Sequence, residues 1–247
     1  MPVFSTNPQP ELSVFRPNSK RDRRCAVISF AGGGYGTRAE HEGEGYARHF
    51  ADEGFHAFVC HYRVNRGEDE VLHPGPLEDG LWAIRWVREQ GESIGFDSDS
   101  VGIIGSSAGG HLVAHLSTHW HEWGTEFRPA WAALCYPVIA LYGPAAHFGS
   151  RAALIGADSS DHLAIQLSPQ NRVTSACPPT FLWHTLEDQP VPIENSLLFA
   201  EALRRANVPF EIHISEKGRH GLGRDADFDW ATRLLQWLEG TGRVPIP

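Results

Sequence analysis

The sequence predicts an α/β fold, in which a mostly parallel central sheet carries helices on both of its faces. Three observations lead to this prediction. Seven short apolar runs have the character of buried strands, five longer stretches show helical periodicity, and each helical stretch falls between two strands or after the last one. No shift in composition and no internal repeat divides the 247 residues, so we expect a single domain over residues 1–247.

Each predicted element is justified by its residue pattern. Buried parallel strands read as continuous apolar runs, and such runs occupy residues 12–15, 26–31, 57–62, 101–105, 131–136, 180–185 and 210–214. Amphipathic helices place apolar residues three and four positions apart, and this pattern occupies residues 39–53, 77–90, 108–119, 193–206 and 225–238. Residues 140–170 interrupt the alternation, with several Gly and Pro residues and one short helical stretch near residues 161–167. Long irregular segments are typical of a cap or a binding loop, so we expect such an insertion there.

Composition and charge exclude several classes of function. The formal net charge of −9 and the isoelectric point near 5.8 argue against nucleic acid as a partner. No apolar run approaches the roughly 18 residues that span a bilayer, and residues 1–15 contain no apolar core of a signal peptide. The cysteines Cys25, Cys60, Cys135 and Cys177 are scattered along the chain. We therefore expect free thiols, a cytoplasmic location and no membrane partner.

Ser107 lies in the most informative motif of the chain. The sequence Gly105-Ser106-Ser107-Ala108-Gly109 directly follows an apolar run and opens a helical stretch. Gly-x-Ser-x-Gly between a strand and a helix is typical of a nucleophile on a sharp turn, because a side chain two residues away on either side would collide with neighbouring backbone. Only Ser107 has glycine at both positions, so we predict that Ser107 is the nucleophile. A small-residue turn between a closely packed strand and helix is the alternative interpretation.

A serine nucleophile needs a base and an orienting acid, and candidates for both lie later in the chain. His220 lies in Gly-Arg-His-Gly after the last predicted strand, on a turn at the carboxyl end of that strand. Asp188 follows the predicted strand 180–185, and Glu187 beside it is the rival acid. Between Asp188 and His220 there is room for one helix and one strand. We predict that Ser107, Asp188 and His220 form the catalytic group.

The glycine-rich segment 31–35 follows the second predicted strand. Consecutive glycines let backbone N–H groups point into a site, so we expect Gly33 or Gly34, together with Ala108, to donate to a developing oxyanion. Residues 34–39 also match Gly-x-Gly-x-x-Ala, a pattern of dinucleotide-binding turns. That pattern requires an acid at the end of the next strand, where the chain has Tyr62 and Arg63. We therefore favour an oxyanion hole over a dinucleotide site.

Two residues near these motifs are candidates for substrate contact. Tyr35 directly follows the glycines and is expected to close one wall of the pocket, and His147 in the insertion is expected to line the acyl or sugar site. Residues His111, His115 and His119 share one helical face, a spacing that also suits zinc. No glutamate lies between the first two, so we interpret them as buried or rim histidines and expect no metal.

The chain resembles an α/β-hydrolase serine esterase and, within that superfamily, the small bacterial carbohydrate esterases of the acetylxylan esterase type. The resemblance extends over nearly the whole chain. It rests on residues 31–35 (Ala-Gly-Gly-Gly-Tyr), 41–43 (His-Glu-Gly), 105–111 (Gly-Ser-Ser-Ala-Gly-Gly-His), 136–138 (Tyr-Pro-Val), 184–188 (His-Thr-Leu-Glu-Asp), 191–192 (Val-Pro) and 218–221 (Gly-Arg-His-Gly).

The resemblance implies hydrolysis of acetyl or other short acyl esters of carbohydrates, with a small acylated sugar as the partner and no cofactor. It implies the roles that the residues themselves suggest: Ser107 as nucleophile, His220 as base, Asp188 as orienter, and Gly33 or Gly34 with Ala108 as oxyanion donors. The chain departs from the family at Ala31, where members often have His or Pro. An amidase, a formamidase or a general short-chain carboxylesterase would use the same residues, and a non-catalytic binding module is a third hypothesis.

Overall fold

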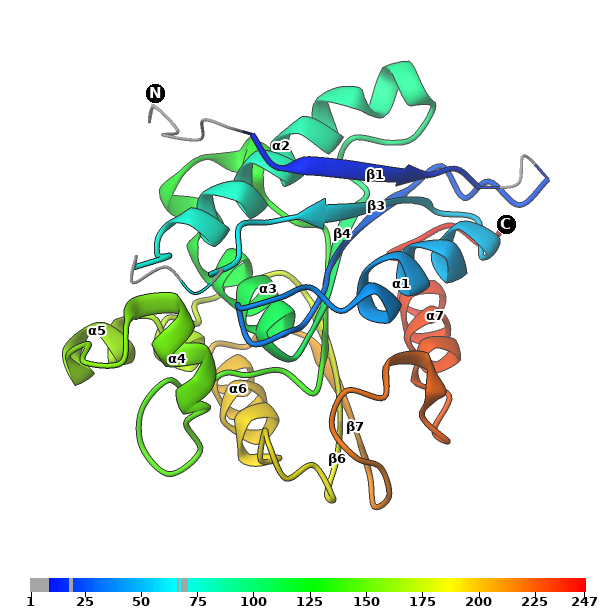
Figure 1. Cartoon of the computed structure of the whole chain (residues 1–247). Coiled ribbons are helices and arrows are strands. Elements are labelled where there is room, and N and C mark those ends of the chain that lie inside the picture. Colours follow the sequence, from blue (N-terminus) through cyan, green and yellow to red (C-terminus); the bar gives the residue numbers. More distant parts are fainter. Residues whose placement is uncertain (1–8, 18–19, 66, 68–70) are drawn as a thin grey trace.

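The strands form one seven-stranded sheet in the part of the chain that the structure, a computed structural model, describes: residues 9–17, 20–65, 67 and 71–247 (Figure 1). Their spatial order is β1-β3-β2-β4-β5-β6-β7. The strands are β1 (Glu11–Phe15), β2 (Ala26–Phe30), β3 (His56–His61), β4 (Val101–Ser106), β5 (Ala132–Cys135), β6 (Thr180–Thr185) and β7 (Phe210–Ser215). β1 pairs antiparallel with β3, and the other pairs are parallel. The predicted mostly parallel sheet is therefore confirmed.

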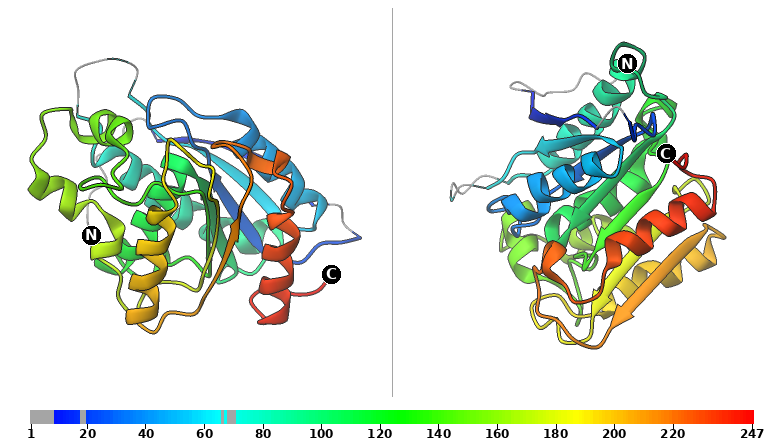
Figure 2. Two further views of the ribbon diagram at one scale, coloured as in Figure 1. Left: turned by 90° about the horizontal axis from the view of Figure 1, so that it is seen from below. Right: turned by 90° about the vertical axis from the view of Figure 1, so that its right-hand side faces the viewer.

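Helices cover both faces of the sheet, as the sequence predicts (Figure 2). α1 (Glu40–Asp52) and α7 (Trp230–Gly240) pack on one face, and α2 (Gly75–Ile94), α3 (Ser107–His119) and α6 (Glu194–Arg205) pack on the other. The last helix begins at Trp230, five positions later than the pattern indicates, because Asp229 caps it by accepting the N–H of Thr232 at 3.2 Å.

Two apolar cores lie on the two faces because neighbouring residues of a strand point in opposite directions. In β2, Val27 packs against the side chains of α1, and Ile28 packs in the core that contains α2 and α3. In β6, Phe181 belongs to the core on the α1 face, and Leu182 belongs to the core on the α2 and α3 face. All four residues are fully buried, which explains why inner strands such as β2 and β6 have mainly apolar residues on both faces.

The segment 140–170 contains two helices, α4 (Phe148–Ile155) and α5 (Asp161–Gln166), of which the sequence indicates only the second. α4 begins at an unusual cap, since the Nδ1 atom of His147 accepts the N–H of Ser150 at 3.1 Å. Histidine is not among the residues that signal a helix start, so the pattern gave no reason to expect this helix. The role of the segment as a cap or binding loop stays a prediction.

All four cysteines are buried free thiols, as expected from their scattered positions. Among the described helices, none combines the length with the apolar character needed to cross a bilayer. The expectation about a signal peptide concerned residues 1–15, and residues 1–8 of this segment lie outside the described part of the chain. The cytoplasmic location stays a prediction.

Candidate active site

The loops that follow four parallel strands leave the same edge of the sheet, and the strand order reverses between two of these strands, β2 and β4. From β2 the chain passes to β3 on one side and then to β4 on the other side of β2. Open α/β sheets bind ligands at such a switch point, beyond the carboxyl ends of the strands. The glycine segment 31–35 follows β2, Ser107 follows β4, Asp188 follows β6 and His220 follows β7.

Ser107 occupies a sharp turn between β4 and α3, and its backbone is left-handed, with φ +51°. A residue with a Cβ adopts this conformation only where its surroundings hold it there. A Cβ on Gly105 would collide with the backbone of Gly109, and a Cβ on Gly109 would collide with the carbonyl oxygen of Phe30. Close backbone approach therefore requires both glycines of the motif, as predicted.

His220 connects Ser107 to Asp188 through two hydrogen bonds. The Nε2 atom of His220 lies 2.8 Å from the Oγ atom of Ser107, and its Nδ1 atom lies 2.6 Å from the Oδ2 atom of Asp188. Because the carboxylate only accepts, Nδ1 carries the proton and Nε2 is left to accept the serine O–H. The structure thus brings the three residues together from loops 32 and 113 positions apart in sequence.

The Asp188 carboxylate is buried, with 5% of the residue exposed, and three donors surround it. Its Oδ1 atom accepts the N–H of Val191 at 3.0 Å, and its Oδ2 atom lies 3.3 Å from the Nε2 atom of His184 as well as near His220. Burial alone would raise the pKa of Asp188, but the hydrogen bonds from His184, His220 and Val191 outweigh burial and lower the pKa to about 2. The carboxylate is therefore ionised throughout the physiological range.

His184 is a contact of the site for which the sequence analysis proposed no role. Its Nε2 atom lies 2.9 Å from the carbonyl oxygen of Val191 and close to the Asp188 carboxylate, so Nε2 carries a proton and donates. Its Nδ1 atom accepts from the Oγ atom of Ser196 at 2.8 Å. The available signal was a histidine within the apolar run of β6, where a polar side chain requires a buried partner.

Glu187, the rival acid, points to a different partner. Its carboxylate accepts from the Nζ atom of Lys217 at 3.0 Å and from the N–H of Gly218 at 3.1 Å. These bonds lower the pKa of Glu187, with the Gly218 bond having the largest effect. The geometry therefore favours Asp188 over Glu187 as the residue that orients His220.

The glycine segment lies against Ser107, since a Cβ on Gly32 would be 3.0 Å from the Cβ atom of Ser107. Gly32 donates its N–H to the Oε2 atom of Glu42 at 2.8 Å. Gly33 and Gly34 have positive φ angles of 129° and 63°, and neither donates its N–H to a protein acceptor within the described residues. Ala108 is the second residue of α3, where N–H groups lack an acceptor within the helix.

Tyr35 does not lie on a pocket wall, in contrast to the expectation from its position beside the glycines. The residue is 1% exposed, and its hydroxyl donates to the Nδ1 atom of His111 at 2.7 Å. The Nε2 atom of His111 in turn donates to the carbonyl oxygen of Leu167 at 2.9 Å. The sequence could not show this, because the partner of Tyr35 is 76 positions away. Tyr35 instead anchors the glycine segment to α3.

His147 lies near the base and the acid. Burial lowers the pKa of His147, the positive charge of His220 lowers it further, and the negative charge of Asp188 raises it. Because Nδ1 accepts the N–H of Ser150, the neutral ring carries its proton on Nε2. His147 therefore presents a second imidazole N–H donor in the neighbourhood of the predicted catalytic group.

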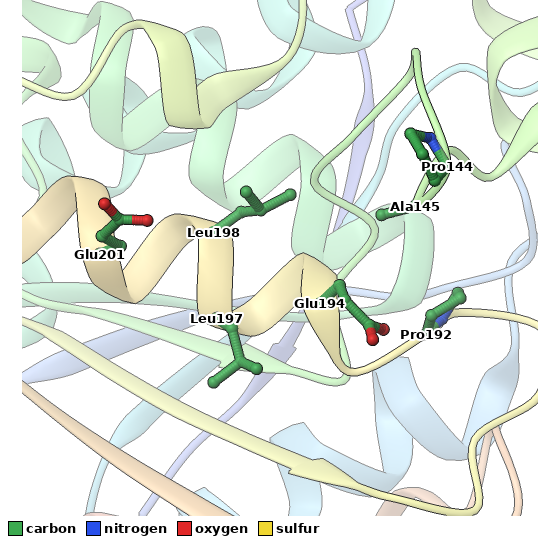
Figure 3. Close-up of a pocket in the computed structure, with 7 residues that line it drawn as sticks. All are labelled: Pro144, Ala145, Pro192, Glu194, Leu197, Leu198 and Glu201. Carbon is green, nitrogen blue, oxygen red and sulfur yellow. The ribbon is translucent and has the colours of Figure 1, made fainter.

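A groove of about 520 Å³ lies between the insertion and α6 (Figure 3). Its lining consists of Pro144, Ala145, Pro192, Glu194, Leu197, Leu198 and Glu201. The first two belong to the insertion shortly before His147, and Pro192 follows Asp188 by four positions. The insertion therefore forms part of a surface depression, as a binding loop would.

Comparison with known proteins identifies the family of this chain. The BD-FAE family model matches residues 12–203. The chain is 36% identical to endo-1,4-beta-xylanase B of Butyrivibrio fibrisolvens, over 86% of this chain and 34% of that protein. It is 31% identical to an acetylxylan esterase of Xylanibacter ruminicola, over 99% of this chain and 50% of that protein. The chain thus spans half or less of the length of these two curated relatives.

A solved structure shows the same fold over most of its length. The acetyl ester-xyloside bifunctional hydrolase of Caldicellulosiruptor lactoaceticus is 40% identical, with a TM-score of 0.86 over 96% of this chain and 89% of that chain. These similarities confirm the α/β-hydrolase fold. The family match covers most of the sheet and the loops that carry Ser107 and Asp188. The chain belongs to the BD-FAE family of α/β-hydrolases.

Proposed function

We propose that this chain is a serine esterase that removes acetyl and other short acyl groups from carbohydrate esters. The observation that carries the proposal is the continuous hydrogen-bond path from Ser107 through His220 to Asp188. The path begins at a serine held on a strained turn and ends at a buried, ionised carboxylate. This combination is the arrangement that converts a weak hydroxyl nucleophile into an effective one.

In the first half of the reaction, Ser107 attacks the ester carbonyl and its proton passes to the Nε2 atom of His220. Asp188 holds the ring in the required tautomer and stabilises the imidazolium that forms. The N–H groups of Ala108 and of Gly33 or Gly34 donate to the oxyanion. Removal of one such donor costs about 3 kcal/mol of transition-state stabilisation in well-studied hydrolases. The alcohol then leaves with a proton from His220.

In the second half, water replaces the alcohol. His220 accepts a proton from the water, which attacks the acyl group on Ser107, and the tetrahedral intermediate collapses to free acid and free serine. In each half of the reaction, His220 first accepts a proton from the attacking hydroxyl or water and then donates it to the leaving oxygen. Activity therefore requires neutral His220 and is lost when this histidine is protonated.

The proposed substrate class rests on the names of two similar proteins and on a hydrogen-bond donor near the predicted catalytic group. Two similar proteins are named acetylxylan esterase and acetyl ester-xyloside bifunctional hydrolase, which suggests an acetylated sugar as substrate here. The Nε2–H of His147 is a donor suited to a sugar hydroxyl or an ester oxygen.

Covalent labelling tests the nucleophile. An organophosphate ester is expected to inactivate the enzyme and to add one phosphoryl mass to the peptide that contains Ser107. The variant Ser107→Ala, treated in the same way, is the matched control and is expected to stay unlabelled. Complete inactivation with an unmodified Ser107 peptide would rule out the proposed nucleophile.

A substrate panel tests the acyl and alcohol preferences. The panel contains acetylated xylo-oligosaccharides, p-nitrophenyl esters of increasing chain length and aromatic formamides. We expect the highest kcat/KM for acetyl esters, a decline from butyrate onward, and higher activity on acetylated sugars than on formamides. Preference for formamides would replace the esterase proposal with an amidase, and inactivity on every ester would favour a binding module.

A further inference from the structure

Glu42 is a buried carboxylate without a basic partner. It lies in the first turn of α1, is 2% exposed, and forms no ion pair with an arginine or lysine in the described part of the chain. The nearest ionisable nitrogen is the Nε2 atom of the exposed His41 at 3.8 Å, which also bonds to the carbonyl oxygen of Gly221 at 3.0 Å. Burial of a carboxylate that pairs with no arginine or lysine costs free energy, and the hydrogen bonds that Glu42 accepts must offset this cost.

Those hydrogen bonds lead to two loops of the site. The Oε2 atom accepts the N–H of Gly32, and the Oε1 atom accepts the O–H of Tyr136 at 2.6 Å. With the N–H of Gly32 occupied, the glycine segment offers its following N–H groups, those of Gly33 and Gly34, to the site. Glu42 thus determines which backbone donors remain available beside Ser107.

Tyr136 continues the path to the base. It follows β5 in a left-handed conformation, with φ +36°, and its ring packs edge-on against the ring of His220, with centroids 5.1 Å apart. Its hydroxyl oxygen accepts the N–H of Gly223, three residues after His220, at 2.8 Å. Burial and the charge of Glu42 raise the pKa of Tyr136, so its hydroxyl remains a donor at physiological pH.

The two side chains therefore join elements that are distant in sequence. α1 packs against the turn 223–225. Beside that contact, the hydrogen bonds of Glu42 and Tyr136 bridge the glycine segment and the loop of His220. We propose that Glu42 and Tyr136 are positioning residues that set the oxyanion donors and the imidazole of His220 relative to Ser107. This inference rests on the proposed esterase function, since it assigns both residues to the same reaction.

The test compares two conservative variants with wild type. Glu42→Gln removes the charge, and Tyr136→Phe removes the hydroxyl while keeping the ring against His220. We expect each variant to lower kcat for p-nitrophenyl acetate 10- to 100-fold, with KM changed less than threefold, because the reacting groups are misplaced while the ester still binds. Titration of Ser107 with an organophosphate counts active sites, so that loss of folded protein does not enter kcat.

The double variant distinguishes positioning from separate structural effects. If both residues act through one connected bridge, Glu42→Gln with Tyr136→Phe lowers kcat about as much as either change alone. The matched control is Asp79→Asn, which neutralises another buried carboxylate that instead pairs with Arg63 at 2.9 Å. It is expected to lower the thermal midpoint and to leave kcat per titrated site within twofold.

Three results would overturn the inference while leaving the esterase function intact: kcat per site within twofold of wild type in both single variants, multiplicative losses in the double variant, or an equal loss in Asp79→Asn. Failure of the proposed function looks different, since wild type itself would then neither hydrolyse p-nitrophenyl acetate nor be labelled at Ser107.

Discussion

Two groups of histidines in this protein differ in whether they contact a carboxylate. His184 and His220 both reach the Oδ2 atom of Asp188. The second group lies along α3 and beside it, with ring centroids 4.2 to 6.2 Å apart, and comprises His73, His111, His115 and His119. Its hydrogen-bond partners in the described structure are hydroxyls and backbone carbonyls.

The difference decides what each imidazole can do. Burial lowers the pKa of every member of the second group, to about 4 for His111 and well below the usual value for His115. The lowered pKa values favour the neutral rings. His111, His115 and His119 are buried, which confirms their interpretation as buried histidines. His220 lies beside an ionised carboxylate, so a proton gained from Ser107 is stabilised there.

Removing the carboxylate should have the largest effect. In Asp188→Asn, the amide N–H₂ faces the Nδ1 atom of His220, so the ring adopts the tautomer with its proton on Nε2 and cannot accept from Ser107. We expect kcat for p-nitrophenyl acetate to fall on the order of 10⁴-fold. Circular dichroism should show an unchanged fold. A loss of less than tenfold would contradict the role of Asp188.

Acid is expected to protonate the histidines of the second group and thereby to lower the free energy of unfolding. The folded pKa of His111 is lowered from 6.5 to about 4, so its contribution is present above pH 6.5 and is lost as the pH falls toward 4. For His111 alone this corresponds to roughly 3 kcal/mol. Urea unfolding at pH 7 and pH 4.5 should show the decrease, and His111→Gln should show a smaller one. Equal pH dependence in both proteins would exclude His111 as a source.

A smaller effect is expected from the second histidine on Asp188. His184→Asn removes the Nε2 donor, which raises the pKa of Asp188 and loosens its carboxylate. We expect kcat to fall about tenfold, the size of one hydrogen bond to a charged group. His184→Gln extends an amide donor toward the Nε2 position and should recover most of the activity. Equal activity in wild type and His184→Asn would show that the bonds from Val191 and His220 suffice.

The smallest effect is expected at Glu187, whose carboxylate contacts Lys217 and Gly218 at the surface. Exposed pairs of this kind contribute little. Glu187→Gln should leave kcat within about twofold of wild type in the assay used for Asp188→Asn. A large loss here, with mild behaviour of Asp188→Asn, would reverse the assignment of the acid.

The site could be predicted where local pattern and chemistry coincide. Ser107 stands between two glycines that backbone contact demands, and Asp188 and His220 each follow an apolar strand on the same edge of the sheet. Tyr35 was placed wrongly because its hydroxyl meets His111, a partner that no local pattern indicates. Glu42 lay within a segment that resembles the family, but its contact with Tyr136 joins residues 94 positions apart.

The sequence alone determined the strands, whose bounds differ by at most one residue from the predicted runs. The reason is clearest for the inner strands such as β2 and β4, which are buried on both faces and are therefore mainly apolar. The sequence also predicted the sharp turn at Ser107, because both glycines of Gly-x-Ser-x-Gly are required by close backbone contact. Only the tertiary structure placed Asp188, and not Glu187, beside His220, and only it showed the contacts that His184, Glu42 and Tyr136 make around the site. Those contacts join residues that are far apart in sequence, and local sequence patterns do not show which distant residues meet in the folded chain.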